Sequence, residues 1–262
     1  MDLPKLQIEI NPLEYEQSIL LRFIRNNNSN NIPYYIYKKY PTLEKLNDSE
    51  FKEEVKRIYN KKQKEFNKKK QIFKKELTKI ETTFLKELSS VLEINWPKNK
   101  TITVFISLNP INPRFLQYWQ TNIYYKKNKS SFKKTLAHEI IHFLYFEKWK
   151  EVFPKYNTEE FDSPHMIWQL SEILVCPILN DPRIRKSLGY KSNRLIGSKG
   201  YLMHKTFKVD YNNKQISIVE YFIKLYNKHI VKEKMQFDKF LQLSNTKFEK
   251  YIPELKNNKM LI

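Results

Sequence analysis

The segment 131–152 constrains the fold of this chain more than any other part of the sequence. Its apolar side chains recur at spacings of three and four residues, at Phe132, Leu136, Ile140, Phe143 and Leu144. Side chains at these spacings share one face of a helix, so the pattern predicts a helix with one side buried in a core. The rest of the fold must supply the apolar surface that covers this side.

The sequence outside this segment predicts both strands and further helices. Thr101–Leu108 alternates and is rich in β-branched residues, which indicates a strand. The aromatic segment Phe115–Tyr125 is expected to form one bent strand or a hairpin. Helical periodicity predicts further helices at 13–25, at 48–93, near 215–232 and near 234–250. The expected class is therefore α+β, with a small sheet and many helices.

This pattern divides the chain into three expected regions. Residues 1–94 are expected to be a helical region of long, basic, amphipathic helices. Residues 95–210 are expected to hold the sheet and the buried helix, and residues 211–262 to form helices packed on that core. A chain of 262 residues is long enough to bury such a core.

The buried helix carries the sequence His138-Glu139-Ile140-Ile141-His142. Two histidines four residues apart on a helix project from the same face, so both imidazoles can bind one metal ion. Neutral imidazole is a good zinc ligand, and three protein ligands leave a fourth position for water. Glu139 follows the first histidine directly and is placed to act as a general base towards that water. The pattern predicts one Zn²⁺ ion at His138 and His142.

A third ligand has to come from another part of the chain. We expect Glu172, because its neighbours in WQLSEILVCPIL are apolar and a metal cation would offset the cost of burying its carboxylate. Asp162 is the rival, although it is also suited to cap the start of the same helix. That helix is expected to begin at Ser163-Pro164, and Pro177 should end or kink it. His165 is a candidate for indirect support of the metal.

HEIIH followed by a helix that carries WQLSEIL resembles the gluzincin branch of the zincin metallopeptidases, and in particular the small forms called minigluzincins. The resemblance covers about residues 100–180. It implies a zincin-like domain, in which an antiparallel-edged sheet lies over an active-site helix and a glutamate helix lies below the metal. It implies peptide-bond hydrolysis, with His138, His142 and Glu172 as zinc ligands and Glu139 as general base. Unlike the larger gluzincins, this chain has Ser171 in place of asparagine.

The family pattern also implies a cleft and a group that stabilises an oxyanion. An extended peptide substrate would add to the edge of the strand within Phe115–Tyr125. A tyrosine or histidine after the glutamate helix would stabilise the oxyanion, and Tyr201 and His204 are the candidates. Alternatively, the segment Phe115–Tyr125 is an aromatic strand of the core with no role in binding.

Two alternatives to a general peptidase remain. One is a regulatory protease that resembles the ImmA/IrrE type, which also pairs HExxH with a downstream helical glutamate and cleaves one dedicated partner protein. The other is a basic, nucleic-acid-binding protein with a structural metal, suggested by a formal net charge of +20. We favour this second alternative less, because nearly all the excess positive charge comes from lysine. Arginine, which binds phosphate and guanine better than lysine does, is scarce.

The remaining features bear on the compartment. The single cysteine, Cys176, cannot form an internal disulfide. No apolar run is long enough to span a membrane, and the first residues are acidic where a secretory signal has its apolar core. A cytoplasmic location is therefore expected, while the oligomeric state is left open.

Overall fold

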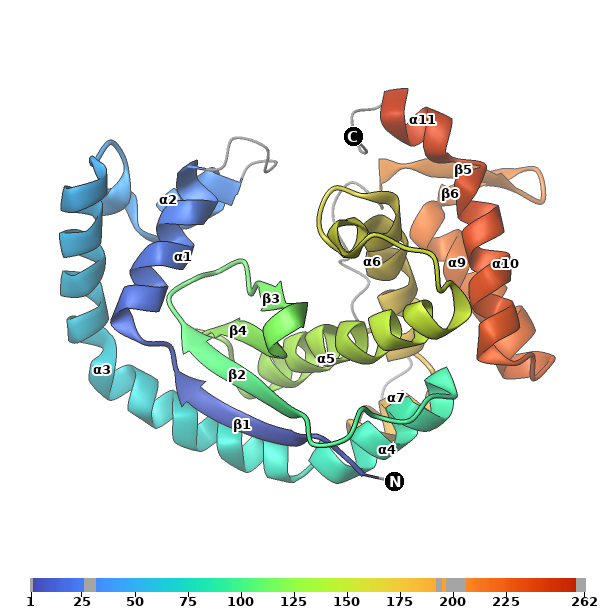
Figure 1. Ribbon diagram of the computed structural model, residues 1–262, viewed down its shortest axis with the longest axis horizontal. Coiled ribbons are helices and arrows are strands. Elements are labelled where there is room, and N and C mark those ends of the chain that lie inside the picture. The colour runs from blue at the N-terminus through green and yellow to red at the C-terminus, as the bar shows by residue number, and fades with distance from the viewer. Residues whose placement is uncertain (1, 26–31, 192–194, 197–205, 258–262) are drawn as a thin grey trace. The chain divides into compact units, whose positions relative to one another are not determined.

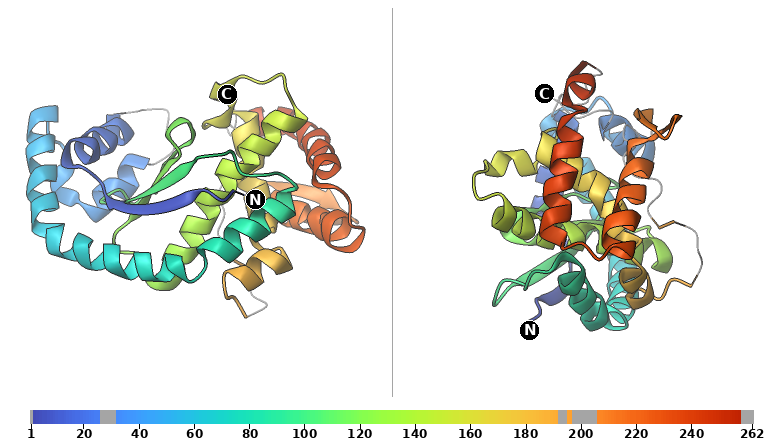
Figure 2. Two further views of the ribbon diagram at one scale, coloured as in Figure 1. Left: turned by 60° about the horizontal axis from the view of Figure 1, so that its bottom comes forward. Right: turned by 90° about the vertical axis from the view of Figure 1, so that its right-hand side faces the viewer.

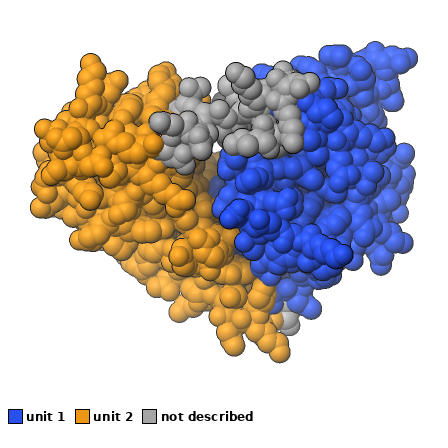
Figure 3. Space-filling view, turned by 45° about the horizontal axis from the view of Figure 1, so that its top comes forward, with its two compact units in different colours: residues 1, 82–96, 137–262 blue, residues 2–81, 97–136 orange. Residues whose placement is uncertain are grey.

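The computed structural model describes residues 2–25, 32–191, 195–196 and 206–257. The fold is α+β, with many helices, one four-stranded mixed sheet and one two-stranded hairpin (Figure 1). The chain forms two compact units, which Figure 3 shows in different colours. Unit 2 consists of residues 2–81 and 97–136, and unit 1 consists of residues 1, 82–96 and 137–262. Across the described residues, no helix combines the length and the apolar character that a membrane crossing requires.

The four-stranded sheet belongs to unit 2 and has the order β1-β2-β4-β3. β1 (Lys5–Ile10), β2 (Thr101–Ser107) and β4 (Gln120–Tyr124) are parallel, and the two-residue β3 (Arg114–Phe115) adds to the edge in the antiparallel direction. The register pairs Ile8 with Val104, and both side chains are buried. The segment 115–125 is thus a hairpin, whose strands are joined by the 3-10 turn Leu116–Tyr118 (η2).

β1 adds a strand to residues 1–94, which were expected to be a region of long helices. The alternation of Leu6, Ile8 and Ile10 with polar residues is a strand signal that the sequence analysis passed over. Figure 2 shows this strand running beside the long helix α3, with which it is in contact. Because β1 pairs with β2, the first and second expected regions share one sheet, and the compact units do not follow the boundaries at 94 and 210.

The helices of unit 2 follow the sequence pattern closely. α1 (Leu13–Arg25) has the expected bounds, and α2 (Ile32–Lys39) and the turn η1 (Pro41–Leu43) follow it. α3 (Asp48–Thr78) begins with a capping box, in which the Asn47 side chain accepts from the Ser49 and Glu50 amides. The helix expected at 48–93 is two helices, because the chain breaks at 79–80 before α4 (Glu81–Leu92). Phe73 of α3 stacks on Phe132 at a centroid distance of 4.0 Å.

A buried polar cluster lies where β1 and β2 end. The carboxylate of Glu16, from α1, accepts from Asn11 Nδ2 at 2.7 Å, from Ser107 Oγ at 2.8 Å and from the Leu108 amide at 2.9 Å. Complete burial raises the pKa of Glu16 to about 7, against the opposing effect of these hydrogen bonds.

Unit 1 is built from helices and the β5-β6 hairpin. It contains most of α4, the part of α5 (Lys129–Val152) from Ala137 onward, and the 3-10 turn η3 (Thr158–Phe161). The remaining elements are α6 (Met166–Leu179), α7 (Pro182–Ser187), β5 (Lys208–Tyr211), β6 (Lys214–Ser217), α9 (Ile218–Tyr226), the π-helical turn η4 (Asn227–Lys232), α10 (Phe237–Glu249) and α11 (Ile252–Asn257). α6 packs against α9, and α10 packs against η4 (Figure 1).

The start of α6 differs from the expectation. The helix begins at Met166 with His165 as its N-cap, so Ser163-Pro164 precedes the helix and does not start it. Pro177 lies inside the last turn, and the helix continues to Leu179. A proline there removes one amide hydrogen, but the end of the helix is closed because the Asn180 amide donates to the Cys176 carbonyl.

At several turns a residue other than glycine adopts the left-handed backbone conformation, in which glycine is usual. Gly189 has φ +73°, and in the part of the chain that the structure describes, eight residues other than glycine also have positive φ: Lys45, Glu93, Asn99, Asn112, Trp119, Asn212, Asn213 and Lys234. Asn212 and Asn213 form the two-residue turn of the β5-β6 hairpin, in which positive φ at both positions matches the twist of the strands.

Candidate metal centre

Two imidazoles project from one face of α5. His138 and His142 lie four residues apart, their ring centroids are 4.9 Å apart, and their Nε2 atoms are 3.2 Å apart. This proximity follows from the helix repeat of 3.6 residues, which brings residues i and i+4 one above the other. The His142 side chain is fully buried, whereas the His138 side chain is 25% exposed.

α6 brings a carboxylate to the same point. Glu172 Oε2 lies 3.3 Å from His138 Nε2, and Glu172 Oε1 lies 3.3 Å from His142 Nε2. The Glu172 side chain is 10% exposed and sits on a helix whose other residues are almost all buried. Among the described residues, His138, His142 and Glu172 are the one group of histidine, cysteine or acidic side chains close enough to hold a metal ion.

The separations between these donor atoms suit a tetrahedral metal. Zinc binds imidazole nitrogen and carboxylate oxygen at about 2.0–2.1 Å, so neighbouring donors in a tetrahedral site lie about 3.3–3.4 Å apart. The two Nε2 atoms, 3.2 Å apart, agree with that spacing, and each of them lies 3.3 Å from a different oxygen of the Glu172 carboxylate. Two imidazoles and one carboxylate are also a donor set that zinc prefers. The residues present therefore fit a zinc ion.

Hydrogen bonding alone explains the arrangement less well. A carboxylate offers lone pairs only, and a neutral imidazole nitrogen carries either a hydrogen or a lone pair. Each Nε2–H group could donate to one Glu172 oxygen at 3.3 Å, but the two N–H groups would then lie side by side with their nitrogens 3.2 Å apart. A shared cation attracts all three donors at once, so the donor set favours a metal.

Glu139 lies on α5 directly after His138 and is only 7% exposed. An ionised carboxylate at such a site is costly unless a positive charge or hydrogen bonds stabilise it. Its sequence position beside the first histidine, together with this burial, makes it the candidate general base.

A stack of aromatic rings supports the buried histidine. Phe146, one helical turn after His142, lies nearly parallel to its ring at a centroid distance of 6.0 Å. Phe161, at the end of η3, packs on Phe146 at 4.5 Å, and Tyr156 stacks on Phe161 at 5.1 Å. The sequence analysis did not single out Phe146, although its position four residues after His142 was a signal for this contact.

The other predicted site residues lie elsewhere. Asp162 follows η3 as an exposed residue and is not part of the histidine–glutamate group, so it is not placed to be the third ligand. His165 is the N-cap of α6 and is also outside the group. Ser171 is buried and donates to the Trp168 carbonyl at 2.7 Å. Tyr201 and His204 lie outside the described residues.

The hairpin of segment 115–125 belongs to unit 2, while the histidines and Glu172 belong to unit 1. That this segment lines a substrate cleft therefore stays a prediction.

Some of the lysines in the basic helix segment 61–70 form ion pairs with nearby glutamates. Lys62 pairs with Glu65 at 3.1 Å, and Lys70 pairs with Glu9 at 2.6 Å. These contacts suit the solvated face of a helix that packs its other side on unit 2.

Comparison with known proteins gave no match: no protein family model, no curated protein and no solved structure is significantly similar to this chain. What can be said of its function therefore depends on its own residues.

Proposed function

We propose that this protein is a zinc-dependent hydrolase of peptide bonds, of the zincin type and with the gluzincin ligand set. The observation that carries the proposal is the group of His138, His142 and Glu172, in which the two Nε2 atoms are 3.2 Å apart and each lies 3.3 Å from one oxygen of the Glu172 carboxylate. Glu139 supports the proposal, because it directly follows His138 on the helix that carries both histidines.

Each residue has a distinct role in this proposal. Nε2 of His138, Nε2 of His142 and the carboxylate of Glu172 would hold the ion. Bound zinc would supply a water whose pKa is lowered towards about 7 and would polarise the substrate carbonyl. Glu139 would accept a proton from the attacking water and deliver it to the nitrogen of the departing amine.

Burial supports the role of Glu139. A carboxylate that is 7% exposed exchanges its proton with few bulk water molecules, so a proton taken from water is retained for the leaving group. The 25% exposure of His138 leaves one side of the group open, as access for a substrate requires.

The substrate is proposed to be a peptide or protein. A regulatory protease of one partner protein would use the same residues, and a survey of unrelated peptides would distinguish it, because it would cleave none of them. The nucleic-acid-binding alternative predicts zinc binding without cleavage and a salt-sensitive affinity for DNA or RNA.

The test measures metal content and peptide cleavage in one set of variants. Purified protein should bind one zinc ion, and His138→Ala and Glu172→Ala should each bind it much more weakly. Glu139→Gln should keep the zinc and lose at least about a hundred-fold in the cleavage rate, as expected for loss of a general base. Glu147→Gln is the matched control, because it removes a carboxylate from the same helix that pairs with Lys150 at 2.7 Å, and it should cleave normally.

Two results would overturn the proposal. One is full zinc binding by the His138→Ala and Glu172→Ala variants, which would place the metal elsewhere. The other is equal cleavage by wild type and Glu139→Gln.

A further inference from the structure

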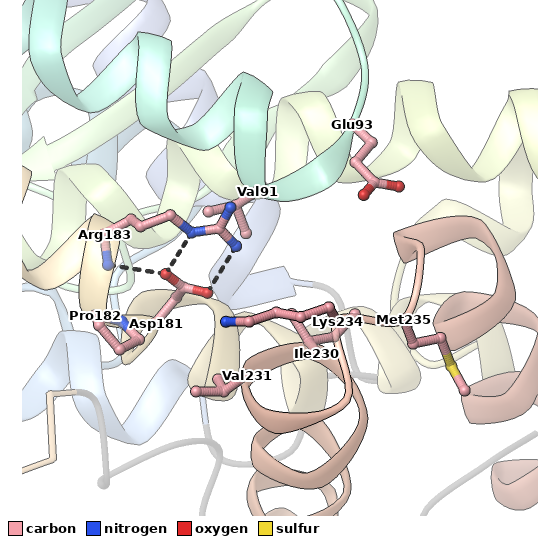
Figure 4. Close-up of a pocket in the computed structure, with 9 residues that line it drawn as sticks. All are labelled: Val91, Glu93, Asp181, Pro182, Arg183, Ile230, Val231, Lys234 and Met235. Atoms are coloured by element: carbon pink, nitrogen blue, oxygen red, sulfur yellow. Dashed lines mark hydrogen bonds and ion pairs between the residues drawn. The ribbon is translucent and has the colours of Figure 1, made fainter.

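Unit 1 contains a cavity of about 260 Å³ that the proposed hydrolase function does not use (Figure 4). It lies between the end of α4, the start of α7 and the turn that joins η4 to α10. Much of its wall is apolar, formed by Val91, Pro182, Ile230, Val231 and Met235. Its volume is somewhat below the usual range for sites that bind drug-sized molecules, so it suits a smaller ligand.

Two of the charged residues that line the cavity neutralise each other. Arg183 donates from Nε and Nη2 to the two oxygens of Asp181, each at 3.1 Å, as Figure 4 shows. The Tyr226 hydroxyl donates to the same carboxylate at 2.8 Å. Asp181 is 2% exposed, so this pair is a fixed part of the wall.

A third charged residue, Glu93, is also engaged. Its carboxylate accepts from the Phe237 amide at 2.8 Å, at the N-terminus of α10, where the helix dipole favours a negative charge. Lys234 is different. Within the described part of the chain, its ammonium is the one charged group of the wall for which the structure shows no hydrogen bond or ion pair.

The wall beside Lys234 has an unusual backbone. Ile230 and Val231 lie on η4, a π-helical turn. Such turns are rare in proteins as a whole, but those that occur are often found at functional sites. The turn closes with a hydrogen bond from the Met235 amide to the His229 carbonyl at 2.8 Å, which leaves Lys234 at φ +58°. The π-helical turn and Lys234, with its positive φ, together place apolar side chains and a cation on the wall of the same cavity.

We propose that this cavity binds a small organic anion, with its carboxylate or phosphate group at Lys234 and its apolar part against Ile230, Val231 and Met235. An inorganic anion would leave the apolar wall uncovered, and a neutral apolar molecule would leave the ammonium without a counter-charge. Carboxylates and phosphates share the chemistry that this wall recognises, and the probes below separate them.

The test uses the zinc-loaded full chain with ¹³C-labelled methionine methyl groups. The Met235 methyl reports on the cavity itself, and its signal is assigned by its loss in Met235→Leu. Hexanoate, hexyl phosphate, hexanol and inorganic phosphate are titrated separately at low salt. We expect hexanoate or hexyl phosphate to shift the Met235 signal in a saturable way, with hexanol and inorganic phosphate at least ten-fold weaker.

Two lysine variants decide whether Lys234 carries the recognition. Lys234→Asn removes the charge but keeps a residue that tolerates positive φ, so it should fold normally and bind about ten-fold or more weakly. Lys232→Gln is the control, because it removes an exposed lysine from η4 that does not line the cavity. Equal weakening by both variants would show a general effect of surface charge and overturn the proposal. No saturable shift of Met235 with either amphipathic anion would overturn it as well.

Discussion

Glu16 gives the protein a pH dependence that can be calculated. Its carboxyl group is fully buried at the ends of β1 and β2, and burial raises its pKa from 4.5 to about 7. In the unfolded chain the group ionises near 4.5, so between pH 4.5 and about 7 the folded state binds one proton more than the unfolded state. Stability must therefore fall as the pH rises through this window and level off above it. At 1.36 kcal/mol for each pH unit, the loss is about 3 kcal/mol.

The substitution Glu16→Gln should remove this loss. The glutamine carbonyl can still accept from Ser107 and Leu108, and its amide group can donate to Asn11 Oδ1, a buried acceptor for which the structure shows no partner. Between pH 5 and pH 8 the wild type should lose about 2.5 kcal/mol relative to the variant.

Hydrogen exchange of the β2 peptides measures this difference locally. At each pH, the exchange rate of the wild type is divided by that of Glu16→Gln, so that the intrinsic effect of pH on exchange cancels. The ratio should rise about 70-fold from pH 5 to pH 8. A ratio that stays constant over this range would show that Glu16 ionises alike in both states, and the reasoning from burial would be wrong.

Further predictions concern the metal centre and the helices. Zinc at about a hundred times its Kd should raise the free energy of unfolding by about 2.7 kcal/mol, seen as a higher Tm that a chelator reverses, and His142→Ala should abolish the increase. If zinc raises the Tm of His142→Ala equally, the ion binds elsewhere. Asn47→Ala removes the capping box of α3 and should cost about 1 kcal/mol in denaturant unfolding, whereas Asn67→Ala, in the exposed middle of the helix, should not destabilise it. Lys148→Met should cost about 1–3 kcal/mol in denaturant unfolding, because it removes the donor to the Glu93 carbonyl and the cation beside the buried Oδ1 of Asp238; an unchanged stability would contradict this reasoning.

Local geometry determined how much of the candidate site could be predicted from the sequence. His138 and His142 are brought together by the helix repeat alone, which the apolar pattern of segment 131–152 revealed. Glu172 could be inferred because a carboxylate on a nearly all-apolar helix needs a compensating charge. The distance between Glu172 and the histidines, however, depends on how α6 packs, and only the structure shows it.

Non-local pairing explains what the sequence did not reveal. The alternation of Leu6, Ile8 and Ile10 is a short strand signal, and because β1 pairs with β2 more than ninety residues later, no adjacent strand in the sequence reinforces it. The cavity of unit 1 draws its walls from residues near 91, 182 and 232, three separate stretches of chain. In the sequence, Lys234 is one of many lysines, and only its place on this wall distinguishes it.

The left-handed residues point to unused stability in this protein. A side chain with a Cβ in that conformation costs about 1–2 kcal/mol where glycine would cost little, although asparagine pays less than lysine or glutamate. Lys45 is exposed and has φ +66°, and among the described residues the structure shows no hydrogen bond or ion pair of its side chain that would offset this cost. A protein engineer seeking a hardier form would therefore begin by placing glycine at such turns and leave the helices and the sheet untouched.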